Sequence, residues 1–180
     1  SFNRPLTLGL SHTEHQSDPD PKIQTLNDAH VGRRAWIIGN GPSVKYSDLD
    51  RIGEQGDIIF CFNRFHLAYP ETTLRDDFVV SADTLMIADF GDEMIKKATG
   101  LPVFCAQKSQ TAMLAGDFIR LNKLDVEMPL FSCDASKYVH VGGSSVFVAL
   151  QLAYYFGIRE VFAYGMDYSF NQNPVFDPRY

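Results

Sequence analysis

Five short runs of consecutive apolar residues constrain the fold of this chain more than any other feature. Each run is short for a helix and too continuous for a strand with one face in water, so it indicates a strand buried on both faces. Segments with a helical pattern lie between the runs. This alternation predicts an α/β fold in which helices cover both faces of a mostly parallel central sheet. The expected strands span residues 35–38, 57–62, 78–81, 101–105 and 160–164, and the expected helices span residues 43–52, 83–98, 111–122 and 145–156.

The length and charge of the chain narrow the classes of function. Its 180 residues suit one domain. It carries 16 Lys and Arg residues against 22 Asp and Glu residues, a formal net charge of -6. Binding to nucleic acid needs a basic excess to neutralise phosphates, so we expect no nucleic-acid partner. No apolar run approaches the ~20 residues that cross a bilayer, so we expect no transmembrane segment.

Polarity divides the chain into two parts. Residues 1–30 are polar and rich in Pro, Asp and His, which predicts an N-terminal arm or linker. Residues 31–180 contain all five apolar runs and form the predicted folded domain. Cys61, Cys105 and Cys133 form no C-x-x-C pair, so we expect reduced core cysteines in a cytoplasmic protein. A peripheral place at a membrane is left open.

Polar motifs gather where the predicted strands end, which is where parallel α/β sheets bind their ligands. The first motif is Gly39-Asn40-Gly41-Pro42-Ser43, which follows the first strand and opens a helix. Its glycines let a ligand approach the backbone, and proline suits the first turn of a helix. Free N–H groups and the helix dipole would then favour an anion such as phosphate. A tight turn without a ligand is the alternative.

Two further motifs follow the second and third strands. Asn63 could bond a base, a ribose or the first loop, and Arg64 could pair with a phosphate or a carboxylate. Ser81 and Asp83 end the third strand, where Asp83 is also well placed to cap the next helix. All four are candidate site residues, and a turn Asn, a surface Arg and a helix cap are the alternatives.

The strongest predicted helix follows a pair of glycines and a pair of hydroxyls. Gly143, Ser144 and Ser145 can form a second anion site or a loop that contacts a base. The alternative is that Ser144 only caps the helix.

The last motif follows the final strand and contains Gly165, Asp167 and Tyr168. Asp167 could orient a ribose or a catalytic group, and an ordinary turn Asp is the alternative. No Ser-His-Asp or Cys-His set can be assembled from the sequence, so Asp167 is the one catalytic candidate.

Taken in order, these motifs resemble the 6-hydroxymethylpterin diphosphokinase MptE-like family. The family includes the flagellin-glycosylating motility accessory factors. Its pattern is similar to that of the bacterial CMP-sialic-acid-dependent sialyltransferases, which share G-N-G-P-S near their start. The resemblance covers roughly residues 24–180.

This resemblance implies a Rossmann-like three-layer sandwich with a nucleotide site at the strand ends. By the same resemblance, Asn40 and Asn63 would contact the CMP part of a sugar donor, and Ser144 and Ser145 would contact its base or phosphate. Asp167 would order the site. The implied reaction is direct displacement at the anomeric carbon, with inversion and without an obligate metal.

The chain departs from the sialyltransferase pattern after the G-x-D motif. Ser169 stands where those enzymes have a tyrosine that supports the departing phosphate, and the next such position falls near Pro174. Their general-base histidine lies further downstream, whereas this sequence ends at Tyr180. We therefore assign no general base and expect a nucleotide-binding domain truncated at its C-terminus.

The leading hypothesis is a nucleotide-sugar-dependent glycosyltransferase-like domain that uses a CMP-activated acidic sugar in surface glycan or protein glycosylation. Its partners would be a nucleotide or nucleotide sugar and a glycan or protein acceptor. One alternative is an ATP-dependent 6-hydroxymethylpterin diphosphokinase with Mg²⁺ held by carboxylates such as Asp83 and Asp167, although the sequence offers no clear phosphate-binding Lys. Another is a non-catalytic binding module. No cofactor other than that Mg²⁺ is implied, and the sequence does not indicate the oligomeric state.

Overall fold

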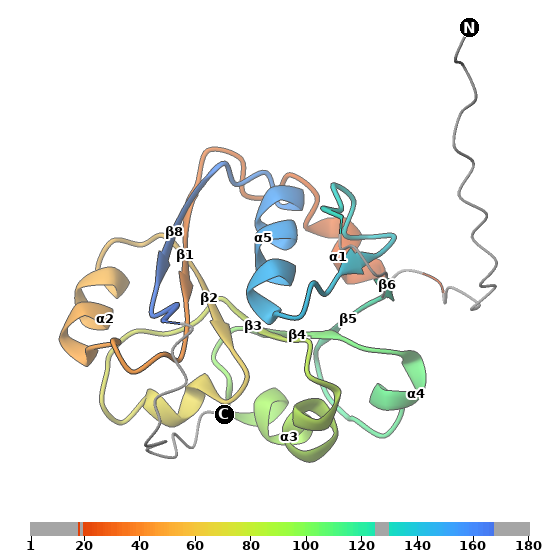
Figure 1. Cartoon of the computed structure of the whole chain (residues 1–180), viewed down its shortest axis with the longest axis horizontal. Coiled ribbons are helices and arrows are strands. Elements are labelled where there is room, and N and C mark those ends of the chain that lie inside the picture. The colour runs from red at the N-terminus through yellow and green to blue at the C-terminus, as the bar shows by residue number, and fades with distance from the viewer. Residues whose placement is uncertain (1–17, 19, 125–129, 168–180) are drawn as a thin grey trace, which may run out of the picture.

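A six-stranded parallel sheet forms the centre of the computed structural model, which describes residues 18, 20–124 and 130–167 (Figure 1). Its strand order is β5-β4-β3-β2-β1-β8, and every neighbouring pair is parallel. The prediction of an α/β fold with a mostly parallel sheet is confirmed. The strands are β1 (Arg34–Ile38), β2 (Ile58–Phe62), β3 (Phe78–Ser81), β4 (Leu101–Cys105), β5 (Ile119–Leu121) and β8 (Glu160–Tyr164).

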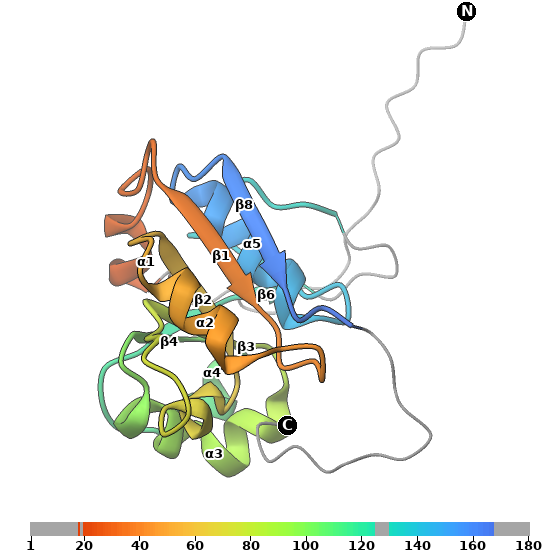
Figure 2. The same cartoon turned by 90° about the vertical axis from the view of Figure 1, so that its left-hand side faces the viewer.

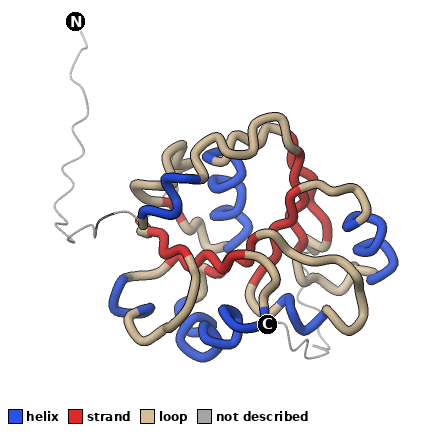
Figure 3. Tube along the Cα trace, turned by 180° about the vertical axis from the view of Figure 1, so that it is seen from behind, coloured by secondary structure: helices blue, strands red, loops and turns tan. Residues whose placement is uncertain are grey.

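Helices cover both faces of this sheet, which completes the expected three layers (Figures 1 and 3). One face carries α1 (Pro21–Thr25) and α5 (Ser145–Tyr155). The other carries α2 (Tyr46–Gly53), η1 (Phe65–Ala68), α3 (Thr84–Lys97) and α4 (Lys108–Thr111). A separate two-stranded parallel sheet pairs β6 (Lys123–Leu124) with β7 (Val139–His140). No helix within the described residues is long and apolar enough to cross a membrane.

The order of the strands reverses beside β1. From β1 the chain moves outward strand by strand to β5, and it then returns to place β8 on the opposite side of β1. In open α/β sheets the crevice at such a reversal, at the carboxyl ends of the strands, is where ligands bind. The loops that follow β1 and β8 meet at this point.

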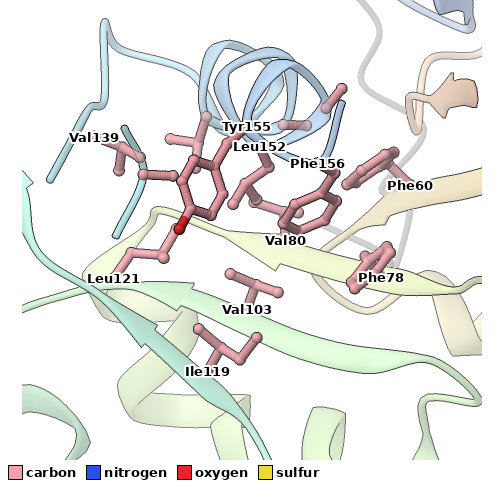
Figure 4. Close-up of a cluster of buried hydrophobic side chains, with 14 of the residues drawn as sticks. Phe60, Phe78, Val80, Val103, Ile119, Leu121, Val139, Leu152, Tyr155 and Phe156 are labelled. Atoms are coloured by element: carbon pink, nitrogen blue, oxygen red, sulfur yellow. The ribbon is translucent and has the colours of Figure 1, made fainter. Parts of the chain in front are cut away.

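Alternation along the strands builds the core. In β2, Phe60 and Phe62 face α5, whereas Ile59 and Cys61 face α2, and all of these side chains are buried. Figure 4 shows Phe60 and Phe78 beneath the aromatic end of α5. The ring of Phe156, the C-cap of α5, lies 5.0 Å from that of Phe78 and 6.1 Å from that of Phe60, so the sheet and the end of α5 share one packed layer. Burial on both faces explains why these strands appear in the sequence as continuous apolar runs.

One predicted helix is wrong. Residues 111–122 were expected to be helical, but α4 ends at Thr111 and residues 119–121 form the edge strand β5. Gly116 has a φ of 128°, which no helix contains, and it separates the two elements. Ile119 and Leu121 alternate into the core on the α5 face, where both are at most 1% exposed. The strand pattern is only three residues long, too short to outweigh the helical pattern before it.

Part of the predicted N-terminal arm packs on the domain. Within α1, Ile23 is 1% exposed and belongs to the main core cluster. Asp20 caps α1 by accepting a hydrogen bond from the backbone amide of Lys22 at 3.0 Å, and it also accepts one from the amide of Arg120 at 3.2 Å. Residues 1–17 lie outside the described residues. Two of the three cysteines are buried as expected, but Cys133 is exposed, so the expectation of a core cysteine was wrong there.

Candidate functional site

The loop of residues 39–45, called here the 39–45 loop, lies against the end of β8 (Figure 2). The Gly39 amide donates to the Tyr164 carbonyl at 2.8 Å, and the Gly41 amide donates to the Gly165 carbonyl at 3.1 Å. A Cβ on Gly39 would lie 2.3 Å from the Gly165 carbonyl oxygen, and one on Gly41 would lie 2.5 Å from it. Both glycines are therefore required for close backbone approach between two loops of the protein itself.

The side chain of Asp167 also binds the 39–45 loop. Its Oδ2 accepts a hydrogen bond from the Ser43 amide at 2.8 Å. Hydrogen bonds from the Ser43 side chain and backbone lower the pKa of this carboxyl, so it is ionised at neutral pH. The Lys45 amide donates to the Tyr164 hydroxyl at 3.0 Å. The amides of Gly39, Gly41 and Ser43 thus have partners within the protein, and α2 begins at Tyr46 rather than at the expected Ser43.

Asn40 presents a buried acceptor at the tip of the 39–45 loop. The side chain is 5% exposed, and its Nδ2 donates to the Phe62 carbonyl at 3.3 Å. Its Oδ1 is buried and has no partner among the described residues. Buried side-chain acceptors in native proteins nearly always have a donor, so this oxygen suits a ligand that brings an O–H or N–H group. The neighbouring Pro42 is exposed.

Asn63 lies at the end of the neighbouring strand in a left-handed conformation, with a φ of 52°. Its Oδ1 accepts a hydrogen bond at 2.9 Å from the hydroxyl of Ser81, a residue with no exposed surface. Its Nδ2 has no hydrogen-bond partner within the described part of the chain, so the amide is available as a donor. Two adjacent strand ends therefore offer one acceptor, on Asn40, and one donor, on Asn63.

Arg64 and Asp83 make contacts within the protein. The Arg64 Nη2 lies 3.1 Å from Glu93 Oε1, and its guanidinium lies 4.1 Å from the centre of the Phe90 ring. Asp83 caps α3 by accepting from the amides of Leu85 at 2.9 Å and Met86. The helix-cap interpretation of Asp83 agrees with this geometry. Arg64 is a partner of α3 in this structure rather than an exposed cation.

The N-terminus of α5 faces the end of β3. Ser144 caps the helix by accepting from the Val146 amide at 3.2 Å, and the Ser145 hydroxyl accepts from the Ala82 amide at 3.0 Å. Gly143 has a φ of 74°, is exposed and would have open space around a Cβ. The backbone just before α5 is therefore open to a ligand, and the helix dipole favours negative charge there.

A buried glutamine holds this region in place. Gln151 has no exposed surface, and its Oε1 accepts from the amides of Ser132 and His140 at 3.0 Å each. Its Nε2 donates to the carbonyls of His140 at 2.7 Å and Phe147 at 2.9 Å. Burial lowers the pKa of His140, which leads into the loop before α5. The sequence analysis did not select Gln151, although a single amide within an apolar helix is the signal that could have found it.

A cavity of about 420 Å³ lies at the amino ends of the strands, away from these residues. Its lining includes Arg33, Asp57, Arg75 and Asp77. The two guanidinium groups already donate to backbone carbonyls, Arg33 to Gly56 at 2.6 Å and Arg75 to Thr72 at 2.7 Å. This hollow therefore does not coincide with the predicted site.

The structure brings most of the predicted site residues to one edge of the sheet. The residues that follow β1, β2, β3 and β8 and those before α5 are all at the carboxyl ends of the strands. Tyr168 lies outside the described residues. No group of three or more His, Cys, Asp or Glu side chains in the described part of the chain could hold a metal ion.

Comparison with known proteins gives a family and a structural neighbour. No curated protein sequence matches the chain. The structure of the MAf glycosyltransferase from Magnetospirillum magneticum AMB-1 is similar in fold, with a TM-score of 0.54 and 15% sequence identity. The match covers 86% of this chain but only 28% of that protein. The sequence profile for 6-hydroxymethylpterin diphosphokinase MptE-like proteins matches residues 12–173, and the chain belongs to this MptE-like family.

Proposed function

We propose that this domain binds a nucleotide sugar and serves in glycosyl transfer, with a CMP-activated acidic sugar as the favoured donor. The observation that carries the proposal is the buried, unpartnered Oδ1 of Asn40 at the reversal point of the sheet. An acceptor kept in that state suits a donor group of a ribose or a base. The Asn63 amide, at the end of the next strand, supplies the complementary donor.

The same contacts indicate where the phosphate of the donor would bind. The amides of Gly39, Gly41 and Ser43 already have acceptors, and the carboxylate of Asp167 lies beside them. A phosphate there would meet a negative charge and few available donors. The open backbone at Gly143 and the N-terminus of α5 provide the better anion site.

Asp167 is proposed to order the site rather than to act as the general base. A carboxyl whose pKa is lowered by hydrogen bonds is a weak base, and the Ser43 amide already occupies its Oδ2. The reaction we propose is an inverting displacement on a glycan or protein acceptor, and no described residue is assigned as its base. The fold shared with a MAf glycosyltransferase supports a function in glycosylation.

Nucleotide binding tests this proposal directly. Thermal shifts with CMP, CDP, UDP, GDP and ATP, each with and without Mg²⁺, would identify the base. A ligand at 100 times its Kd adds about 2.7 kcal/mol to the free energy of unfolding, which raises the Tm of a domain of this size by roughly 5–10 °C. We expect CMP to do so without metal.

The variant Asn40→Ala should weaken CMP binding at least tenfold, whereas Asn27→Ala, which alters an exposed amide away from the site, should not. Absence of stabilisation by any cytidine nucleotide would overturn the proposal. Stabilisation by ATP with Mg²⁺ alone would favour the diphosphokinase activity in the family's name, and CMP binding without transfer would favour a binding module.

A further inference from the structure

Three side chains that are cationic or can become so converge on Glu93, a residue of α3 outside the site described above. Its Oε1 lies 3.1 Å from Arg64 Nη2, 2.7 Å from His66 Nε2 and 3.7 Å from Lys97 Nζ. The Arg64 guanidinium also stacks on the ring of Phe90 from the same helix. We call these five residues the Glu93 cluster.

Three members of the cluster, Arg64, His66 and Glu93, are too buried to separate freely, whereas the side chain of Lys97 is 59% exposed. The His66 side chain is 3% exposed, that of Arg64 is 18% exposed and that of Glu93 is 24% exposed. Burial alone would raise the pKa of Glu93, but hydrogen bonds from His66 and Arg64 outweigh it and hold that pKa below its usual value. The carboxyl is therefore ionised at neutral pH, and it is the acceptor that joins the two side chains.

Two of the three partners of Glu93, Arg64 and His66, belong to the segment that carries Asn63. Arg64 follows Asn63 directly, and His66 lies in η1, whose first turn is closed by a hydrogen bond from the Leu67 amide to the Arg64 carbonyl at 3.0 Å. Asn63 has a φ of 52°, a conformation that a residue with a side chain keeps only when its surroundings hold it there. Ser81 holds its side chain, and the Glu93 cluster holds the backbone that follows.

We propose that Glu93 is a positioning residue of the nucleotide site: by binding Arg64 and His66 it fixes the turn that aims the Asn63 amide at the ligand. This inference rests on the proposed function for its ligand. The clamp, by which we mean the contacts of Glu93 with Arg64 and His66, exists without nucleotide. Of the two kinds of partner expected for Arg64 from the sequence, a phosphate or a carboxylate, it assigns the carboxylate of Glu93.

Hydrogen exchange in the nucleotide-free protein tests the clamp. The variant Glu93→Gln keeps the size of the side chain and removes its charge. We expect exchange at the amides of Asn63 and Leu67 to accelerate at least tenfold, while the core strands keep their protection. The matched control is Asp89→Asn, which removes one charge from an exposed position of α3. Unchanged exchange at Asn63, or equal acceleration in the control, would overturn the proposal.

A double-mutant cycle then tests whether Glu93 acts through Asn63. Glu93→Gln should weaken CMP binding about tenfold in the otherwise unchanged protein. In an Asn63→Gly background, which keeps the left-handed turn and removes the amide, the same change should have almost no further effect. Equal losses in both backgrounds would show a general structural effect and refute positioning. If the unchanged protein binds no nucleotide, the proposed function fails, and the exchange experiment still decides the clamp.

Discussion

The close packing of the 39–45 loop against the end of β8 makes Gly41→Ala a severe test of the site's geometry. A Cβ at position 41 would lie 2.2 Å from Asp167 Oδ2 and 2.5 Å from the Gly165 carbonyl oxygen. Rotation of Asp167 could relieve the first contact only by breaking its hydrogen bond to Ser43. The second contact is with the carbonyl of Gly165, which accepts a hydrogen bond from the Gly41 amide, so moving that carbonyl away would break the bond. Overpacking of this kind costs about 1–3 kcal/mol, and we expect the upper end because neither neighbour can yield without losing a bond.

Calorimetry of the variant would measure this cost. A loss of about 3 kcal/mol lowers the Tm of a domain of this size by roughly 6–12 °C. The control Gly53→Ala places a Cβ 3.4 Å from the nearest atom, at the end of α2, where alanine is tolerated. It should change the Tm by at most about 2 °C, because the small gain in helix propensity offsets any crowding. If Gly41→Ala has the same Tm as the control, the two loops are not packed as described. The amides of the 39–45 loop would then not be occupied by partners within the protein.

Two further predictions concern the polar groups that the fold buries. Burial lowers the pKa of His66 and of His140 below the ordinary value of 6.5. As the pH falls, the unfolded chain therefore binds protons at these histidines before the folded protein does. The free energy of unfolding should be constant above neutral pH and should fall as the pH drops through 6.5. Urea unfolding from pH 8 to pH 5 measures this, and a flat or rising profile would contradict it. Gln151→Leu removes the acceptor of two buried amides, Ser132 and His140, and should cost about 2–4 kcal/mol by the same unfolding assay. A loss below about 1 kcal/mol would mean that the 130–140 segment finds other partners without it.

The centre of the sheet was predictable because β2, β3 and β4 are buried on both faces, whereas the edge strand β8 is exposed or half-buried along its length. The run at residues 58–62 has no polar face, and its alternation with helical segments favours a parallel sheet between two layers of helices. The helix at residues 145–156 was equally clear, since it ends before Gly157, which has a φ of 86°. The prediction was wrong at the outermost strand, β5. This strand spans three residues, and its place in the sheet depends on pairing with β4 rather than on its own sequence.

The gathering of the site residues was also predictable, because strand ends share one edge of a parallel sheet. The contacts that each of these site residues makes could not be predicted. The glycines of the 39–45 loop were expected to admit a ligand, whereas in the structure they admit the backbone of Gly165. Arg64 was expected to pair with a phosphate or a carboxylate, and the sequence did not indicate that Glu93 of α3 would be its carboxylate partner. Both outcomes depend on residues at least 29 positions away in the chain, so no local pattern could indicate them.

The polar groups at the two ends of the parallel strands differ in whether the protein itself supplies their hydrogen-bond partners. The cavity of about 420 Å³ lies at the amino ends of the strands. Two charged groups of its lining already have partners: the guanidinium of Arg33 donates to a carbonyl, and the carboxylate of Asp77 accepts from the amide of Ile59 at 2.8 Å. At the carboxyl ends, the Oδ1 of Asn40 has no donor. A buried acceptor left in that state costs the folded protein about 1–3 kcal/mol. A ligand that supplies the donor recovers that free energy, whereas a ligand that used Arg33 or Asp77 in the cavity would compete with bonds that these groups already make. The unpaired oxygen of Asn40 therefore supports the proposed site at the carboxyl ends more strongly than the cavity supports a site at the amino ends.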